Sequence, residues 1–262
     1  MKTSLRKQLW FKKYTALALV LAALFMGVPK IYAQGKFVKN IVIVHGHYLD
    51  ASGWKGVYSI LTKKGYHVTL VQNPLTSLKD DLAATNNILG NQDGPTILVG
   101  HSWGGTVITE AGVHPKVAAL VYVAGFMPDK GETTRKLASS FPKLPEMRTE
   151  APNSGGFIFY DRSTFRAGVA RDLSKEDADF MNASQIPIHK DCFDTPLNDA
   201  AWRTKPSYGI LTANDRTINP DLQRSMYKNA KVKVTELKAG HVVYISQPQA
   251  VADIIIEASL QQ

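Results

Sequence analysis

Short apolar segments alternate with amphipathic segments over most of the chain. Six segments have the pattern of β-strands, namely Asn40–Val44, His67–Val71, Thr96–Gly100, Val117–Gly125, Tyr208–Ala213 and Lys231–Leu237. The inner segments are apolar throughout, which is typical of parallel strands that are covered on both faces. Lys231–Leu237 alternates between polar and apolar residues, so we expect it near a solvated edge of the sheet.

Segments with helical periodicity lie between these strands, at Trp54–Lys64, Ser77–Leu89, Trp103–Val113, Pro220–Lys228 and Gln247–Leu260. Three of them carry terminal signals. Ser77, and Asn219 before Pro220, favour helix starts, whereas Gly65 and Gly90 favour helix ends. The alternation of strands and helices predicts an α/β fold, with a mostly parallel sheet of about six strands and helices on both faces.

The segment from residue 128 to residue 205 interrupts this alternation. It contains no convincing buried strand, several prolines, and charged helical pieces such as Leu173–Ser184. A long insertion between two core strands is typical of a lid over a site, so we expect a helical lid here. A second packing layer with no role in the site is the alternative.

The first 33 residues have the organisation of a secretory signal peptide. Met1–Lys13 is basic, Thr15–Val28 is uncharged, and Ala33 is a plausible cleavage position. We therefore expect export to the periplasm or the medium, with residues 34–262 as the folded domain and no stable membrane insertion after cleavage. A retained anchor is the alternative, although the uncharged run is shorter than the roughly 20 residues that span a bilayer. No cysteine stands directly after this run, which excludes lipid attachment there.

Much of the positive charge belongs to this signal peptide. The chain carries a net charge of +9, but its first 33 residues contain six basic and no acidic residues, so +3 remains for the rest. No block of Lys or Arg remains, so nucleic-acid binding is not expected. Cys192 is the only cysteine, which excludes an internal disulfide, and no Cys/His cluster has the spacing of metal ligands. The sequence therefore predicts neither a metal nor a cofactor.

A serine lies where an apolar strand is followed by a helix. The sequence Gly100-His101-Ser102-Trp103-Gly104 fits the pattern G-x-S-x-G of a nucleophile elbow, a tight turn that lifts the serine hydroxyl clear of the sheet. Glycines on both sides allow the strand and the helix to approach the turn closely. We therefore predict that Ser102 is a nucleophile. A glycine-rich turn with an idle serine is the alternative.

A serine nucleophile needs a histidine base. Three histidines follow Ser102 in the sequence. His114 lies at the far end of the helix that starts at the elbow, and His189 lies in the insertion. His241 follows the last strand and precedes the last helix, which places it at the carboxyl edge of the sheet. We predict that His241 is the base.

The base in turn needs an orienting acid, which in this order of elements lies between the serine and the histidine. Asp215 comes two residues after the strand at Tyr208–Ala213. Asp129, after the preceding strand, is the rival and could instead cap a turn. We predict Asp215.

Acyl transfer also requires donors for the developing oxyanion. We assign the backbone N–H of Trp103, directly after the serine, and the backbone N–H of His47, in the loop after the first strand, where Gly46 allows a close approach. The side chains of His45, His47 and His101 could instead suggest a metal. No carboxylate has ligand-like spacing beside them, so we expect His45 and His101 to make structural hydrogen bonds below the site.

The four motifs VHGHYLDASGW, VGHSWGG, TANDRTI and GHVVYISQP resemble those of the α/β-hydrolase superfamily. Within it, the chain looks most similar to a bacterial branch related to plant methylesterases and hydroxynitrile lyases. The resemblance extends from about Lys39 to the end, and it implies an α/β-hydrolase fold with a lid. It is weakest in the lid, which usually sets substrate choice.

The resemblance leaves two chemistries open. Hydrolases of this kind cleave esters, whereas the lyases cleave cyanohydrins and carry a lysine directly after the catalytic histidine. Val242 stands at that position here, which favours an esterase that acts on small to medium-sized esters without a cofactor. Dehalogenase relatives use aspartate at the elbow, so Ser102 argues against that activity. A binding protein with the same fold but without catalytic activity is a third hypothesis.

Four apolar residues of the insertion bear on the substrate: Phe157, Ile158, Phe159 and Phe165. They could contact an apolar part of the ester or form the core of the lid, and the sequence leaves both readings open.

Overall fold

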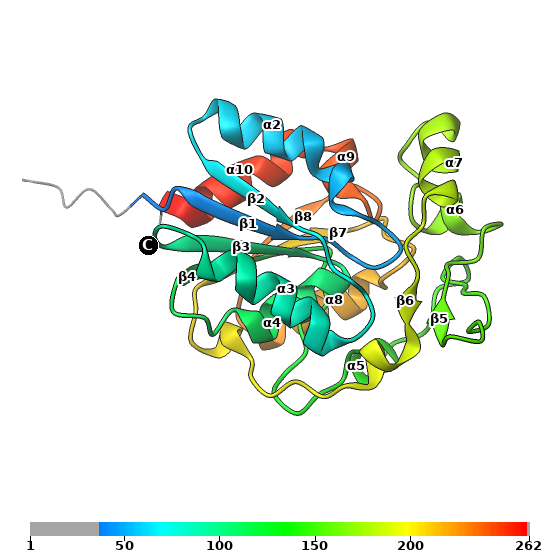
Figure 1. The fold of residues 1–262 in the computed structure, drawn as a ribbon. Coiled ribbons are helices and arrows are strands. Elements are labelled where there is room, and N and C mark those ends of the chain that lie inside the picture. Colours follow the sequence, from blue (N-terminus) through cyan, green and yellow to red (C-terminus); the bar gives the residue numbers. More distant parts are fainter. Residues whose placement is uncertain (1–36, 261–262) are drawn as a thin grey trace, which may run out of the picture. The chain divides into compact units, whose positions relative to one another are not determined.

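The computed structural model describes residues 37–260, so the predicted signal peptide lies outside the described residues. A six-stranded sheet forms the centre, in the order β2-β1-β3-β4-β7-β8, and every neighbouring pair is parallel (Figure 1). Its strands are β1 (Asn40–Val44), β2 (His67–Val71), β3 (Thr96–His101), β4 (Val117–Val123), β7 (Ser207–Thr212) and β8 (Lys233–Leu237). The predicted parallel sheet is confirmed.

Burial along the strands follows their position in the sheet. β1 and β3, in the interior, are buried at every residue. β8 is exposed at three of its five residues and lies at one edge, as its alternating sequence predicts.

Helices cover both faces of the sheet (Figure 1). On one face, α2 (Lys55–Lys63) contacts α10 (Pro248–Leu260), and the short helix α9 (Val243–Ser246) lies beside them. On the other face, α3 (Leu78–Gly90) contacts α4 (Trp103–Ala111), and α8 (Pro220–Asn229) packs against β7. The predicted α/β architecture, a mostly parallel sheet with helices on both faces, is therefore confirmed.

Several boundaries differ from the sequence prediction for local reasons. β4 ends at Val123 because Ala124 has a positive φ of 42°, and β8 begins at Lys233 because Lys231 has a φ of 54°. The helix predicted from Trp54 is preceded by a 3₁₀ turn, η1 (Ala51–Trp54), that Asp50 caps. Helix α9 was not predicted because four residues are too few to show a period.

The insertion between β4 and β7 (residues 124–206) contains only short elements. They are α5 (Thr134–Ala138), β5 (Phe157–Ile158), α6 (Phe165–Gly168), α7 (Lys175–Ala183), β6 (Ile188–His189), η2 (Lys190–Asp194) and η3 (Ala201–Arg203). β5 and β6 pair in a two-stranded antiparallel sheet. In Figure 1, α6, α7, β5 and β6 lie beyond the carboxyl ends of the central strands. Among residues 37–260, no helix combines the length and apolar character needed to cross a membrane.

Candidate active site

Ser102 lies in a strained turn between β3 and α4. Its backbone has φ 52° and ψ −120°, which residues other than glycine rarely adopt. Its N–H donates to the carbonyl of Val123 (3.3 Å), and its carbonyl accepts from the N–H groups of Gly105 (2.9 Å) and Phe126 (3.0 Å). Three hydrogen bonds thus hold the turn in the geometry that the G-x-S-x-G pattern predicts.

The glycines on either side of the serine are required by close backbone contacts. A Cβ atom at Gly100 would collide with the carbonyl of Gly104, and one at Gly104 would collide with the carbonyl of Val44. Helix α4 can therefore start directly against the ends of β1 and β3 only because neither residue has a side chain.

Asp215 follows β7, His241 follows β8, and their side chains form a buried hydrogen bond. His241 Nδ1 lies 2.9 Å from Asp215 Oδ2, and the two side chains are 3% and 0% exposed. Because the carboxylate accepts, Nδ1–H donates, which leaves Nε2 of His241 to take up a proton from another group. The structure therefore brings the predicted base and the predicted acid together.

Four further protein groups donate hydrogen bonds to the carboxylate of Asp215. Oδ1 accepts from the backbone N–H groups of Thr217 (2.7 Å) and Ile218 (3.0 Å). Oδ2 accepts from the hydroxyl of Thr212 (2.9 Å) and the amide of Gln223 (3.0 Å). These donors stabilise a carboxylate at a buried position where an unpaired charge would be costly. Sequence reasoning missed Gln223, because a glutamine within a helix gives no indication of what it faces.

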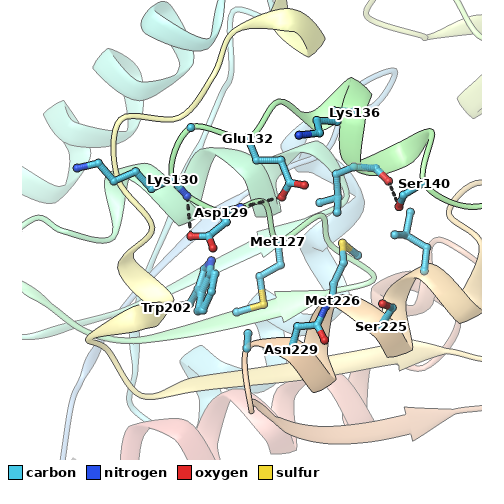
Figure 2. Close-up of a pocket in the computed structure, with 14 residues that line it drawn as sticks. Met127, Asp129, Lys130, Glu132, Lys136, Ser140, Trp202, Ser225, Met226 and Asn229 are labelled. Atoms are coloured by element: carbon cyan, nitrogen blue, oxygen red, sulfur yellow. Dashed lines mark hydrogen bonds between the residues drawn. The ribbon is translucent and has the colours of Figure 1, made fainter.

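Asp129, the rival acid, lies in a different environment. Its carboxylate accepts from the guanidinium of Arg203 in a partly exposed ion pair, and this hydrogen bond lowers its pKa. Asp129 lines a pocket of about 440 Å³, which we call the second pocket because it is separate from the cavity at His47 described below. Figure 2 shows Asp129 in this pocket, together with Trp202 and Met226. The backbone N–H of Lys130 also donates to Asp129 (2.7 Å). The carboxylate of Asp129 is thus hydrogen-bonded to Arg203 and Lys130 and not to His241.

His101 connects the serine turn to His241. Its Nε2–H donates to the backbone carbonyl of His241 (3.0 Å), and the two ring centroids are 4.6 Å apart. Ser102 directly follows His101, and its buried hydroxyl forms no hydrogen bond with any described residue. Hydrogen bonds between a nucleophile and its base often tighten only when substrate is bound.

His45 makes structural hydrogen bonds below the turn. Its Nδ1–H donates to the carbonyl of Gly46 (2.7 Å), and its Nε2 accepts from the backbone N–H of Asn73 (2.9 Å). These two bonds fix one neutral tautomer, and burial lowers the pKa of the ring. Within residues 37–260, no group of three or more His, Cys, Asp or Glu side chains is arranged to hold a metal ion.

Two further imidazoles near His241 are held neutral. Burial and, to a smaller extent, proximity to His241 together lower the pKa of His47 to about 3. The same two causes hold the pKa of His101 well below its usual range. Neither ring therefore adds positive charge beside His241 at neutral pH.

Trp103, which contributes one of the predicted oxyanion donors, is anchored by a buried acid. Its indole N–H donates to Asp81 Oδ2 (2.8 Å), while Asp81 Oδ1 accepts from the backbone N–H of Leu75 (2.8 Å). Burial raises the pKa of Asp81 to about 6. The sequence did not reveal this role, since an acid in the first turn of α3 is expected from helix electrostatics alone.

A cavity of about 500 Å³ lies between the loop after β1 and the insertion, and His47 lines it. Its apolar lining includes Phe126, Phe141, Leu144, Met147, Ile158 and Phe193. Gly46, before His47, approaches the serine turn so closely that a Cβ there would lie 2.8 Å from Ser102 Cβ. The predicted oxyanion loop therefore lies against the serine turn at Gly46 and lines the cavity at His47.

The two rival histidines lie away from Ser102 and His241, and the apolar residues of the insertion are found in two different environments. His114 follows α4 at the end opposite Ser102, and the ring of His189 packs against Phe157 in the insertion. Ile158 lines the cavity, whereas Phe165 is wholly buried.

The sequence pattern of the Alpha/beta hydrolase family matches residues 41–254. The chain belongs to the α/β-hydrolase family. Methylesterase 7 of Arabidopsis thaliana is 30% identical over 252 residues, which cover 84% of this chain and 95% of that protein. Norfluorocurarine synthase 2 of a Strychnos species is 24% identical over 253 residues, which cover 84% of this chain and 94% of that protein. The predicted resemblance to plant methylesterases is thus confirmed.

Solved structures of this α/β-hydrolase fold are also similar. A pyrethroid hydrolase from Sphingobium faniae matches with a TM-score of 0.74 and 23% identity, over 85% of this chain and 97% of that one. Polyneuridine aldehyde esterase matches with a TM-score of 0.73 and 20% identity, over 85% and 99%. At this identity the likeness concerns the fold.

Proposed function

We propose that this α/β-hydrolase cleaves carboxylic esters of small to medium size through an acyl-enzyme. The observation that carries the proposal is the strained serine turn beside the buried His241–Asp215 hydrogen bond, at the same edge of the sheet. The relative named methylesterase, which is 30% identical, supports ester chemistry.

In the proposed reaction, Ser102 Oγ attacks the ester carbonyl while His241 Nε2 takes its proton. Asp215 orients His241 and stabilises the imidazolium. The backbone N–H groups of His47 and Trp103 hold the oxyanion, and Trp103 N–H is suited to this because the first N–H groups of a helix have no partner within it. His241 then protonates the leaving alcohol, and a water molecule that it activates releases the acid.

The residue after His241 favours hydrolysis over a lyase reaction. Val242 is buried and apolar, so it offers no cation to hold a leaving cyanide.

Hydrolysis of p-nitrophenyl esters of increasing chain length by the purified protein tests the proposal. We expect turnover that falls by at least about 10⁴-fold in Ser102→Ala. Ser140→Ala is the matched control, because Ser140 lines the second pocket and its hydroxyl donates to Leu137. Turnover that survives in Ser102→Ala would refute the assignment of Ser102 as the nucleophile. Turnover that is lost in Ser140→Ala but kept in Ser102→Ala would refute it as well.

We further propose that the protein is exported and that residues 1–33 are removed. The basic and apolar organisation of these residues supports this. Amino-terminal sequencing of protein from the medium or periplasm of a producing bacterium should give Gln34 as the first residue. Full-length protein that remains with the membrane fraction would favour the retained anchor instead.

A further inference from the structure

The imidazole of His47 lies in the wall of the 500 Å³ cavity. Its ring centroid is 4.3 Å from that of Tyr48 and 5.4 Å from that of Phe193, and both of these residues line the same cavity. The side chain therefore lies between aromatic groups, on the side of the loop that faces the insertion.

The hydrogen-bonding capacity of this ring is unused within the protein. His47 is 4% exposed, and neither ring nitrogen forms a hydrogen bond with a described residue. The ring of His45 has protein partners at both nitrogens, and that of His101 has one at Nε2. A buried polar group without a partner is costly and calls for an explanation.

Thr217, a buried polar residue of the cavity wall, has a protein partner. The hydroxyl of Thr217 donates to the carbonyl of Gly168 (3.1 Å). At the edge, Asn219 caps α8, and Arg135 pairs with the exposed Asp194. His47 thus differs from Thr217, Asn219 and Arg135 in that neither of its ring nitrogens has a partner among the described residues.

A neutral imidazole offers one donor and one acceptor, and burial keeps this ring neutral. A hydroxyl group matches it in either tautomer, because a hydroxyl also donates and accepts. The ring belongs to the residue whose backbone N–H is proposed to hold the oxyanion, so a group bound by it would lie near the scissile ester.

We propose that the imidazole of His47 hydrogen-bonds to a hydroxyl group of the ester substrate close to the scissile bond, and that it thereby selects hydroxy esters over alkyl esters of the same shape. The inference rests on the proposed function and names its substrate class. His47 would then act twice, through its backbone N–H on the oxyanion and through its side chain on the neighbouring substituent.

Pairs of esters that exchange a hydroxyl for a methyl group test this. Suitable pairs are methyl lactate with methyl isobutyrate, methyl β-hydroxybutyrate with methyl isovalerate, and hydroxyethyl butyrate with propyl butyrate. Acid release in a pH-stat gives kcat/KM for each, divided by the alkaline hydrolysis rate of the same ester to remove differences in intrinsic reactivity.

We expect the wild-type protein to prefer the hydroxy ester in at least one pair, and His47→Phe to reduce that preference by about tenfold. The backbone N–H remains in this variant. His47→Gln, which keeps a donor and an acceptor, should retain most of the preference. Phe193→Leu reshapes the same wall without a polar change, so it should alter rates but not the preference.

Equal preference in the wild-type protein and His47→Phe, with hydrolysis still dependent on Ser102, would overturn this inference and leave the proposed function intact. The wild-type series decides the question even if His47→Phe does not fold, because the absence of a hydroxyl preference in all three pairs also overturns it. Hydrolysis that is independent of Ser102 would instead contradict the proposed function, and the inference with it.

Discussion

Both carboxylate oxygens of Asp215 have protein donors, whereas the hydroxyl of Ser102 and both ring nitrogens of His47 have none among the described residues. We call the first region the acid side, comprising Asp215 and its donors. The second is the substrate side, comprising Ser102, Trp103 and the loop at Gly46 and His47. All of these residues are buried, so exposure does not explain the difference.

The contrast separates what must be fixed before substrate arrives from what must respond to it. An ionised carboxylate needs its donors at all times, because a buried unpaired charge is costly. A nucleophile and a recognition group need free hydrogen-bonding capacity for the ligand. The hydrogen bonds of the acid side are complete within the protein, and under the proposed function the ester would complete those of the substrate side.

The largest effect should come from breaking the acid side. Asp215→Asn should lower kcat by about 10⁴-fold, because a carboxamide cannot accept at both positions and no longer stabilises the imidazolium of His241. Asp129→Asn should leave kcat within about twofold, as expected for a partly exposed ion pair. The values of kcat with a p-nitrophenyl ester decide between the two carboxylates. A large loss in Asp129→Asn with little change in Asp215→Asn would assign the acid to Asp129.

A smaller loss should follow from crowding the substrate side. The Cβ of Gly46→Ala would lie 2.8 Å from Ser102 Cβ and 3.0 Å from His101 Nδ1, which pushes the loop away from the oxyanion. We expect kcat to fall by about 100-fold, the cost of one lost oxyanion donor. Gly90→Ala is the control, since a Cβ there meets no atom within 4 Å. If both variants keep full activity, the loop at Gly46 does not supply the donor.

Removing one donor from the acid side should have a moderate effect. Gln223→Leu loses the amide that donates to Asp215 and accepts from the backbone N–H of Thr212 (3.1 Å). We expect kcat to fall by about tenfold with KM nearly unchanged, because one hydrogen bond to a charged group contributes roughly 1.5–3 kcal/mol. The exposed Gln249→Leu should change neither constant. A rise in KM alone would place Gln223 at the substrate instead.

The smallest effect is a pH dependence of stability at Asp81, which supports the substrate side through Trp103. Its pKa is raised from 3.8 to about 6 by burial, so the folded state favours the protonated form. Its contribution is therefore most favourable below pH 3.8 and is lost as the pH rises to about 6. In urea unfolding, the stability advantage of the wild type over Asp81→Asn should shrink by roughly 1–3 kcal/mol across this range.

Asp80 provides the control of opposite sign. Hydrogen bonds from Thr76 and Ser77 lower the pKa of this exposed carboxyl, so its contribution is lost as the pH falls. In Asp80→Asn, the stabilising contribution of Asp81 should still be lost between pH 3.8 and 6. A wild-type profile that matches that of Asp81→Asn would show that Asp81 does not titrate in this range.

Much of the fold could be predicted because burial on both faces requires uniformly apolar strands, and these are visible in the sequence. The order of motifs likewise indicated that Asp215 would meet His241. Boundaries such as Ala124 and Lys231 could not be predicted, since a positive φ at a residue other than glycine depends on what the surrounding structure imposes.

The sequence by itself determined the element order, the serine turn and the residue types that follow each strand, because these depend on local pattern and on the common edge of a parallel sheet. Only the tertiary structure decided that Gln223 supports Asp215, that Asp81 holds Trp103, and that the ring of His47 is buried without a partner. Hydrogen bonding and burial at these positions arise from segments far apart in the chain, and no local pattern encodes which segments meet.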